Sequence, residues 1–380
     1  MEINKLNLTI RTKYKKYLSQ NGNLALVNKK NISYNSNIIS KKSKNAQICP
    51  VIKANAYGVG VIPITRILIE LGYKSFFVAN ISEGIEVRNK FKNLDLYILN
   101  CGQPLNTKII KKYNLIPVLN SLEEIKLWIE NGLYNSKCII HIDTGMNRLG
   151  VSSNDISDMK NKNYFIKLNI KFIMTHLACA EDKNNNLNLR QLNKFKKLTN
   201  TLTKITKNSI KSSICNSSGI WLGKQYLLNI TRPGAAFLGI SPLASNKQNP
   251  LRETISLYTQ IIQIKKVPKN TSIGYGQTLK LKKESIIATI SIGYSHGFAR
   301  LLSNKGNVYI GKEKLNILGR VSMDLTVIDI SKFNYGEIKT GDIVEIFGPN
   351  RSLEKFAREN NTIPYEIICN MGKNIPKIIV

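Results

Sequence analysis

One lysine of this sequence stands where it could act as a nucleophilic amine. The stretch Val51-Ile-Lys-Ala-Asn-Ala-Tyr-Gly-Val59 places Lys53 at the end of an apolar segment, before a polar turn that contains Tyr57. Burial disfavours the ammonium form of a lysine and lowers its pKa, which is what Schiff-base chemistry requires. Taken alone, a solvated lysine at a strand end is the more ordinary interpretation, so the rest of the chain must decide.

Other residues that can bind anions or transfer protons also stand at the ends of apolar segments. They are Arg148, His176, Asn216, Ser217 and Arg232. From about residue 47 short apolar segments alternate with longer amphipathic ones, which is typical of βα units and a parallel sheet. Strands are expected at 47–54, 75–79, 96–100, 115–119, 138–144, 170–177, 212–217 and 228–232. A TIM-type (β/α)8 barrel requires this number of strands, and it carries its active site at their C-terminal ends.

Helices are expected between these strands, most clearly at 63–71, 82–91, 121–131 and 187–205. Two of them would begin with a capping hydroxyl and an early glutamate, Ser82 with Glu86 and Ser121 with Glu124. Beyond Pro250 the pattern changes to short alternating segments at 259–265, 285–292, 315–319, 326–330 and 343–347. The sequence therefore predicts a barrel domain over 33–250 and an all-β C-terminal domain over 251–380.

Composition narrows the classes of protein to consider. The 380 residues contain no apolar run long enough for a membrane span and no secretory leader, and the six cysteines form no Cys-x-x-Cys pair, so we expect a cytoplasmic protein with reduced thiols. The formal charge of +32 would suit a nucleic-acid-binding protein. However, the lysine pairs are scattered along the chain and no nucleic-acid-binding module is present, so we expect no specific nucleic-acid partner. Three histidines are too few for a His-rich metal site.

Eight short motifs, in the same order, resemble those of alanine racemases, the pyridoxal-phosphate (PLP) enzymes that interconvert L- and D-alanine. The lysine stretch is the first. The others are His141-Ile-Asp-Thr-Gly-Met-Asn-Arg-Leu-Gly150, Thr175-His-Leu-Ala-Cys-Ala180, Cys215-Asn-Ser217, Arg232-Pro-Gly-Ala-Ala236, Gly274-Tyr-Gly-Gln-Thr278, Gly319-Arg-Val-Ser-Met-Asp324 and Ile363-Pro-Tyr-Glu366. The resemblance covers the chain from about residue 30 to the C-terminus. It implies a barrel joined to a β-rich domain, with a strand at about 24–31 added to the C-terminal sheet and residues 1–20 as an extension that the family lacks.

The same resemblance implies the roles of the site residues. Lys53 would hold the cofactor and serve as one base, and Tyr275 of the partner subunit would be the second base, helped by His176 to lose its proton. Arg232 would face the ring nitrogen of PLP and leave it unprotonated. Cofactor binding would also involve Tyr57, Asn216, Ser217, Gly234, Ala235 and Tyr365, and substrate binding would involve Arg148 and Met323. Out of context, Tyr275 would be a turn aromatic and Arg232 a surface arginine before a turn.

Some positions depart from the family pattern. His141 stands where many members have a carbamylated lysine that holds the arginine matching Arg148, and an imidazole cannot supply that negative charge. Asp143, on the same strand face, or a bound anion would have to substitute. Ser213 replaces a histidine that often supports the ring-facing arginine. These changes bear on catalytic rate more than on the type of reaction.

The sequence thus predicts an alanine racemase that forms homodimers with shared active sites and makes D-alanine for peptidoglycan. A broad-specificity PLP racemase and a barrel decarboxylase are alternatives within the same cofactor class. A non-enzymatic PLP-binding barrel is a third, but such proteins lack a domain like the one expected after residue 251. Strictness for alanine and the role of residues 1–20 are not encoded in any motif.

Overall fold

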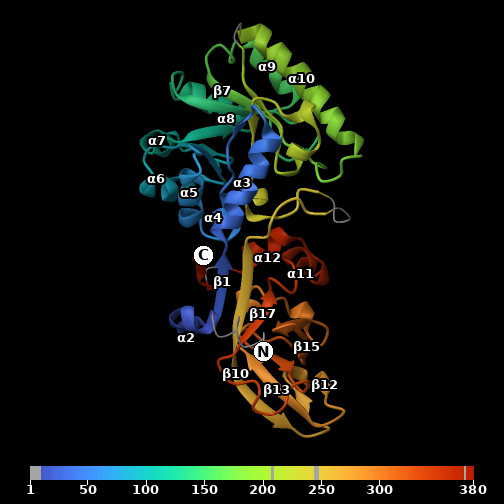
Figure 1. Cartoon of the computed structure of the whole chain (residues 1–380). Coiled ribbons are helices and arrows are strands. Elements are labelled where there is room, and N and C mark those ends of the chain that lie inside the picture. Colours follow the sequence, from blue (N-terminus) through green and yellow to red (C-terminus); the bar gives the residue numbers. More distant parts are fainter. Residues whose placement is uncertain (1–9, 207–208, 244–247, 372–373) are drawn as a thin grey trace. The chain divides into compact units, whose positions relative to one another are not determined.

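The computed structural model of the chain describes residues 10–206, 209–243, 248–371 and 374–380. They form two compact units (Figure 1). One is Asn31–Arg252, and the other combines the described part of Met1–Lys30 with Glu253–Val380. No helix of these residues is both long and apolar enough to cross a membrane.

The unit Asn31–Arg252 is a closed barrel of short parallel strands. In chain order these are β2 (Gln47–Ile48), β3 (Ser75–Val78), β4 (Asp95–Ile98), β5 (Ile116–Leu119), β6 (Lys137–His141), β7 (Asn169–Met174), β8 (Ser212–Ser213) and β9 (Ile230–Thr231). Their order in the 8-stranded sheet is β2-β9-β8-β7-β6-β5-β4-β3, and a parallel bridge between Val51 and Phe77 joins its two ends. The predicted (β/α)8 barrel is therefore confirmed.

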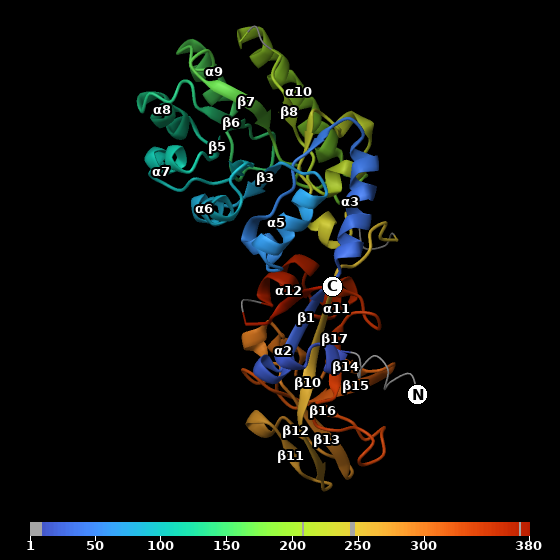
Figure 2. The same ribbon diagram turned by 60° about the vertical axis from the view of Figure 1, so that its left-hand side comes forward.

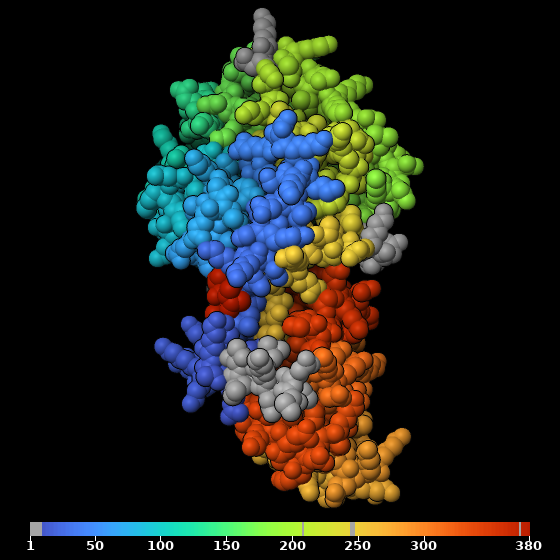
Figure 3. Space-filling view, viewed as in Figure 1, coloured from blue at the N-terminus to red at the C-terminus, as the bar shows by residue number. Residues whose placement is uncertain are grey.

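Helices surround this barrel (Figure 2). They are α5 (Val61–Glu70), α6 (Ile81–Lys90), α7 (Thr107–Lys112), α8 (Leu122–Glu130), α9 (Ser153–Asn161) and α10 (Asn186–Thr206), while α3 (Lys29–Ser43) precedes the first strand and lies on the outer surface (Figure 3). Ser121 caps α8 as predicted, by accepting the N–H of Glu124. The predicted cap at Ser82 is wrong, because the Asn80 side chain caps α6 and leaves Ser82 inside the first turn.

Apolar side chains from successive strands fill the barrel interior. Phe77, Tyr97 and Phe172 stack edge to face or tilted, with ring centroids 4.8 Å apart for Phe77 and Tyr97 and 5.4 Å apart for Tyr97 and Phe172. All three are buried in one cluster with Cys49 and Met174. The barrel is thus a packed core, so a ligand must bind at one of its ends.

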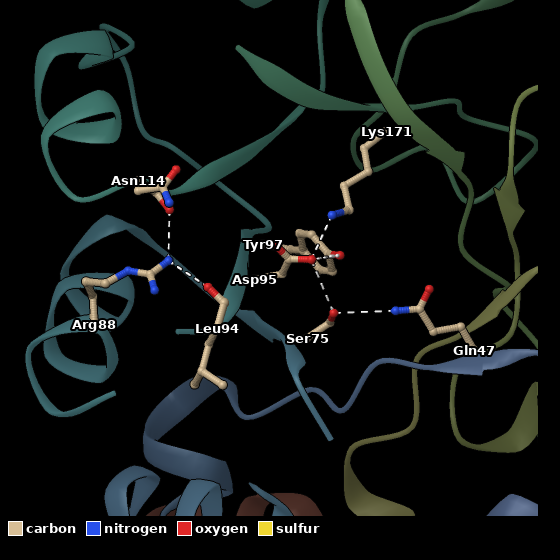
Figure 4. A network of polar contacts seen from close by, with 8 residues as sticks. All are labelled: Gln47, Ser75, Arg88, Leu94, Asp95, Tyr97, Asn114 and Lys171. Carbon is tan, nitrogen blue, oxygen red and sulfur yellow. Dashed lines mark hydrogen bonds and ion pairs between the residues drawn. The ribbon is translucent and has the colours of Figure 1, made fainter. Parts of the chain in front are cut away.

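A polar network occupies the amino-terminal end of the strands (Figure 4). The Lys171 ammonium lies 2.7 Å from the Asp95 carboxylate and 5.6 Å from the ring centroid of Tyr97. The Ser75 hydroxyl donates to Asp95 over 3.5 Å and accepts from the Gln47 amide over 3.4 Å. These groups satisfy one another's hydrogen bonds and charges, which accounts for the polar side chains at this end. Polar side chains at the opposite, carboxyl ends of the strands therefore call for a functional explanation.

The second unit is built on a mixed, mostly antiparallel sheet. Its strands are β1 (Asn23–Val27), β10 (Ile255–Val267), β13 (Ser285–Ile290), β14 (Asn307–Ile310), β15 (Glu313–Leu318), β16 (Thr326–Asp329), β17 (Ile343–Phe347) and β18 (Lys377–Ile379), with a separate hairpin of β11 (Ser272–Ile273) and β12 (Leu279–Lys280). β1 pairs antiparallel with β10 and parallel with β18, so it belongs to this sheet. The strand expected over 24–31 ends at Val27, because Lys29 begins α3.

Two features of this unit were not expected from the sequence. Helices α11 (Leu353–Glu359) and α12 (Pro364–Asn370) accompany the sheet. Of the segment 1–20, residues 1–9 lie outside the described residues, and the rest leads into helix α2 (Lys15–Asn21). Ile10, Tyr14 and Leu18 pack in one apolar cluster with sheet residues that include Tyr258 and Ile343. The described part of the extension therefore belongs to the core of this unit.

Candidate active site

Lys53 begins a short left-handed turn at the carboxyl end of the first barrel strand. The next residues have φ and ψ of 53° and 50° at Ala54, 55° and 47° at Asn55, and 51° and 54° at Ala56, and Tyr57 has φ of 56°. This conformation costs an L-residue roughly 1–2 kcal/mol, and none of the residues is glycine. The left-handed turn, residues 54–57, must therefore be held by contacts from outside it.

Tyr57 ends the left-handed turn beside residues that follow two other strands. A Cβ built on Gly234 would lie 2.1 Å from the Tyr57 hydroxyl oxygen, so the phenol packs directly on this glycine. The Ser217 hydroxyl accepts the N–H groups of Gly234 over 3.1 Å and of Ala236 over 3.3 Å. Two hydroxyls and two backbone N–H groups thus converge, a donor-rich arrangement that suits a phosphate.

The other predicted members of this region lie next to it. Asn216 precedes Ser217, and its side chain accepts the N–H of Gly219 over 2.9 Å. Ala235 begins the 3-10 turn Ala235–Leu238 and is buried. Asn216 thus shapes the loop after β8, and Ala235 belongs to the turn that carries the N–H of Ala236 toward Ser217.

Arg232, one residue after β9, is 3% exposed, and both terminal nitrogens of its guanidinium donate hydrogen bonds. It donates to the Ser213 hydroxyl, to the Thr175 carbonyl over 2.6 Å, and toward Nδ1 of His176 over 3.4 Å. Burial lowers the pKa of Arg232 to about 10, so it remains a cation at neutral pH. Ser213 thus supports this arginine as an uncharged acceptor, and its own O–H donates a hydrogen bond to the Ile230 carbonyl over 2.7 Å.

His176 is an uncharged imidazole. Burial, followed by the positive charges of Arg232 and Arg148, lowers its pKa well below the usual value. Since Arg232 can only donate, Nδ1 of His176 is the acceptor and the proton resides on Nε2. The buried Gln191 of α10 fixes the segment by donating to the His176 carbonyl over 2.8 Å.

His141 is also neutral but has the opposite tautomer. Its Nδ1 lies 2.8 Å from Oδ1 of Asn120, whose amide N–H groups donate to the carbonyls of Leu99 and Val118. Oδ1 must therefore accept, which leaves Nε2 of His141 as an acceptor. Burial, and then the charge of Arg232, lowers the pKa of His141 to about 4.

The sequence suggested that Asp143 shares a strand face with His141, but Asp143 lies beyond the end of that strand. β6 ends at His141, and Oδ1 of Asp143 accepts the N–H groups of Gly145, Met146 and Asn147 over 2.9 Å, 3.0 Å and 3.2 Å. This carboxylate shapes the loop that carries the exposed Arg148.

The remaining predicted residues, Tyr275, Met323 and Tyr365, belong to the second unit. Tyr275 is 71% exposed between Gly274 and Gly276, which have φ of 71° and 68°. Met323 is 55% exposed, and Tyr365 is half-buried in α12. The described barrel unit thus brings Lys53, Tyr57, His176, Asn216, Ser217, Arg232, Gly234 and Ala235 to one end, while these three lie in another part of the fold.

Several supporting residues had no motif to reveal them. Asn120 and Gln191 orient the two histidines or their backbone, and Glu83 of α6 accepts two N–H groups, one of them from Ala54 in the left-handed turn. A carboxylate in the first turn of a helix is usually attributed to the helix dipole, so sequence alone gave Glu83 no special role. Among the described residues no group of three His, Cys, Asp or Glu could hold a metal ion, and none of the six cysteines, all of which are described, forms a disulfide.

Comparison with known proteins connects both units to one family. The chain matches the model of the N-terminal domain of alanine racemase over residues 27–242 and that of its C-terminal domain over residues 254–379. It is 40% identical over 341 residues to the alanine racemase of Rickettsia bellii, covering 88% of this chain and 82% of that protein. It is 34% identical over 366 residues to that of Brucella abortus, covering 92% and 91%.

Solved structures agree with the sequence comparison. Alanine racemase from Bartonella henselae with covalently bound pyridoxal phosphate superposes with a TM-score of 0.87 at 32% identity, over 94% of this chain and 99% of that one. The biosynthetic alanine racemase of Pseudomonas aeruginosa gives a TM-score of 0.83 at 26% identity, over 94% and 99%. The match of both domains, together with relatives above 30% identity along most of the chain, shows that this protein is an amino-acid racemase and belongs to the alanine racemase family.

Proposed function

We propose that this protein interconverts L- and D-alanine with PLP, using Lys53 and Tyr275 as bases on opposite faces of the substrate. The observation that supports it best is the meeting of three features at the carboxyl end of the barrel: a lysine in a constrained turn, a donor-rich cradle and a buried arginine beside a neutral histidine. Such strand ends are where barrel enzymes carry their active sites.

The residues present fit PLP. The Tyr57 and Ser217 hydroxyls and the N–H groups of Gly234 and Ala236 would hold its phosphate. Lys53 would attach it covalently, and Tyr365 and Asn216 would complete its binding. When bound, PLP supplies delocalisation that makes the α-proton of the amino acid acidic enough to remove.

Arg232 sets the electronic character of that site. Hydrogen bonds to Ser213, Thr175 and His176 fix a guanidinium that can donate but not accept a proton, so the group that it faces stays unprotonated. A weakened electron sink favours brief removal and return of the proton over transamination. Ser213 keeps the arginine in place without adding a charge.

His176 would prepare the second base by donating a hydrogen bond to it. Arg232 directs the proton of this imidazole to Nε2, which can then donate to a phenolic oxygen. A donor to the phenolate lowers the pKa of a tyrosine, which is otherwise near 10. Tyr275 of a partner chain would accept this hydrogen bond from His176. It would then remove or return the α-proton on the face opposite Lys53.

A homodimer is the state in which Tyr275 could act this way. In its own unit Tyr275, Tyr294, Leu301, Met323 and Leu325 are all exposed large apolar side chains. Exposed aromatic and apolar groups of this kind suit a protein interface. We propose that this surface packs on a second copy, so that Met323 contacts substrate in the partner's site.

Arg148 would bind the substrate carboxylate. Its loop is shaped by Asp143, and its charge lies near enough to lower the pKa of both histidines. His141 offers it an uncharged acceptor at Nε2 in place of a carbamate. D-alanine from this reaction would supply peptidoglycan, and six cysteines without a disulfide suit a cytoplasmic location.

Chiral chromatography of L-alanine incubated with the PLP-loaded protein tests the proposal. We expect equal amounts of both enantiomers of alanine at equilibrium. Other small amino acids should be racemised more slowly than alanine. Lys53→Ala should abolish both the absorption band of the covalently bound cofactor and racemisation. A Lys53→Ala protein that racemises alanine at the wild-type rate would refute the assignment.

A further inference from the structure

We propose that Glu83 is a positioning residue, whose carboxylate holds the left-handed turn and thereby fixes Lys53 and Tyr57 at its two ends. The proposal rests on the proposed function, in which Lys53 attaches the cofactor and Tyr57 binds its phosphate.

The carboxylate of Glu83 joins two loops of the barrel. Oε1 accepts the N–H of Ala54 over 2.7 Å, and Oε2 accepts the N–H of Ala79 over 2.7 Å. Ala54 directly follows Lys53, and Ala79 directly follows β3. Glu83 therefore connects the chain after the first strand to the chain after its neighbour in the barrel, at the end where the cofactor would bind.

Only an anionic carboxylate matches this pair of partners. Both partners are N–H donors, and each of the two oxygens accepts one bond. A glutamine of the same size has one oxygen and one NH2 group, so one of the two N–H groups would face another donor. Hydrogen bonds to a charged acceptor are also about twice as strong as neutral ones.

The left-handed turn cannot hold its own beginning. Its internal hydrogen bonds run from the N–H of Ala56 to the Ile52 carbonyl over 2.9 Å and from the N–H of Gly58 to the Ala54 carbonyl over 2.7 Å. The N–H of Ala54, the first left-handed residue, is instead bound by Glu83. Because alanine disfavours this conformation, loss of that bond would let the chain beside Lys53 move toward ordinary φ values.

Helix α6 is itself fixed, so that Glu83 acts from a rigid base. Asn80 caps its start by accepting the N–H of Glu83 over 3.0 Å. The buried Arg88 donates to the carbonyls of Leu94 over 2.8 Å and Asn114 over 2.9 Å (Figure 4). Between them, a Cβ on Gly84 would lie 2.7 Å from Cδ1 of Ile98, so the helix packs closely on β4.

The test compares Glu83→Gln with the control Glu86→Gln, which makes the same change on an exposed position of the same helix. Hydrogen–deuterium exchange of the protein without cofactor should be faster at one or both of the amides of Ala54 and Ala79 in Glu83→Gln alone, because glutamine keeps only one acceptor oxygen for the two N–H groups. With PLP bound, its induced circular dichroism should weaken, and kcat should fall by roughly 10- to 100-fold because the lysine is displaced. The Glu86→Gln protein should match the wild type in all three.

A purely structural role would lower the unfolding temperature but leave the dichroism per bound cofactor and kcat unchanged, and that result would overturn the proposal. Unchanged exchange at both amides would overturn it too. Glu83→Asp keeps the charge but is one methylene shorter, so it should show the same three changes and serves if the glutamine variant does not fold. If the wild type neither binds PLP nor racemises alanine, the proposed function fails instead, while the exchange data still show whether Glu83 holds the turn.

Discussion

Replacement of Gly234 by alanine should weaken PLP binding by displacing Tyr57. The added Cβ would lie 2.1 Å from the phenolic oxygen, 2.8 Å from Cζ and 2.9 Å from Cε2 of Tyr57. Ordinary contacts between heavy atoms are about 3.5–4.0 Å, so the end of the ring must retreat by roughly 1 Å or more. Gly234 has φ of −130°, so alanine adds bulk without requiring a left-handed backbone.

The size of the effect follows from the bond that would be lost. If the phenol of Tyr57 donates to the cofactor phosphate, breaking that bond costs about 1.5–3 kcal/mol, or roughly 10- to 150-fold in the dissociation constant. Titration of cofactor-free protein with PLP, followed by absorbance, measures this directly. Tyr57→Phe should give a loss of similar size, and the double variant should be little worse than either single one.

Two results from this set of single and double variants would contradict the prediction. Unchanged affinity in Gly234→Ala would mean that the cradle of Tyr57, Ser217 and Gly234 does not bind phosphate. Losses that add in the double variant would mean that the alanine acts on the backbone N–H groups rather than through the phenol. Thermal unfolding without cofactor checks that Gly234→Ala does not simply weaken the barrel.

Other predictions follow from the same geometry. Activity should be insensitive to bicarbonate, because His141 cannot form a carbamate; loss on degassing with recovery in bicarbonate would show that another lysine has this role. Inactive Lys53→Ala and inactive Tyr275→Phe subunits should regain activity on mixing, because one site of each heterodimer is then intact; confirmed exchange without activity would contradict a shared site. Burial lowers the pKa of His141 from 6.5 to about 4. Between these two pH values the native state binds fewer protons than the unfolded state, so the native state is destabilised as the pH falls from 6.5 to about 4. The free energy of unfolding in urea should fall by at most about 1.4 kcal/mol per pH unit from this residue, and a slope unchanged in His141→Gln would contradict this.

The barrel was predictable because its signal is local. Apolar segments separated by amphipathic ones identify the strands, and the polar residues that follow them must meet at one edge. The ends of the strands were less predictable: the segment 47–54 contains only the two paired residues of β2, with Val51 joined to Phe77 as an isolated bridge. Hydrogen bonding to neighbours, which the sequence does not display, decides where a strand stops.

The left-handed turn shows what sequence reasoning could not find. Residues Ala54, Asn55, Ala56 and Tyr57 include no glycine, so their local preferences argue against this conformation. It is stabilised by Glu83, which lies 29 residues from Ala54. The motif that makes Lys53 recognisable is therefore also a segment whose shape depends on a residue outside it.

The two histidines of the barrel show how similar electrostatic environments can accompany opposite hydrogen-bonding roles. Burial and nearby cations keep both neutral, so neither can supply charge. Their neighbours then assign opposite tautomers: Arg232 makes Nε2 of His176 a donor, and Asn120 makes Nε2 of His141 an acceptor. A donor suits the phenolate proposed for Tyr275, and an acceptor suits the guanidinium of Arg148. If His141 is the partner of Arg148, as proposed, the arginine has a neutral support in place of a charged one, so we expect a lower rate for the same reaction rather than a different reaction.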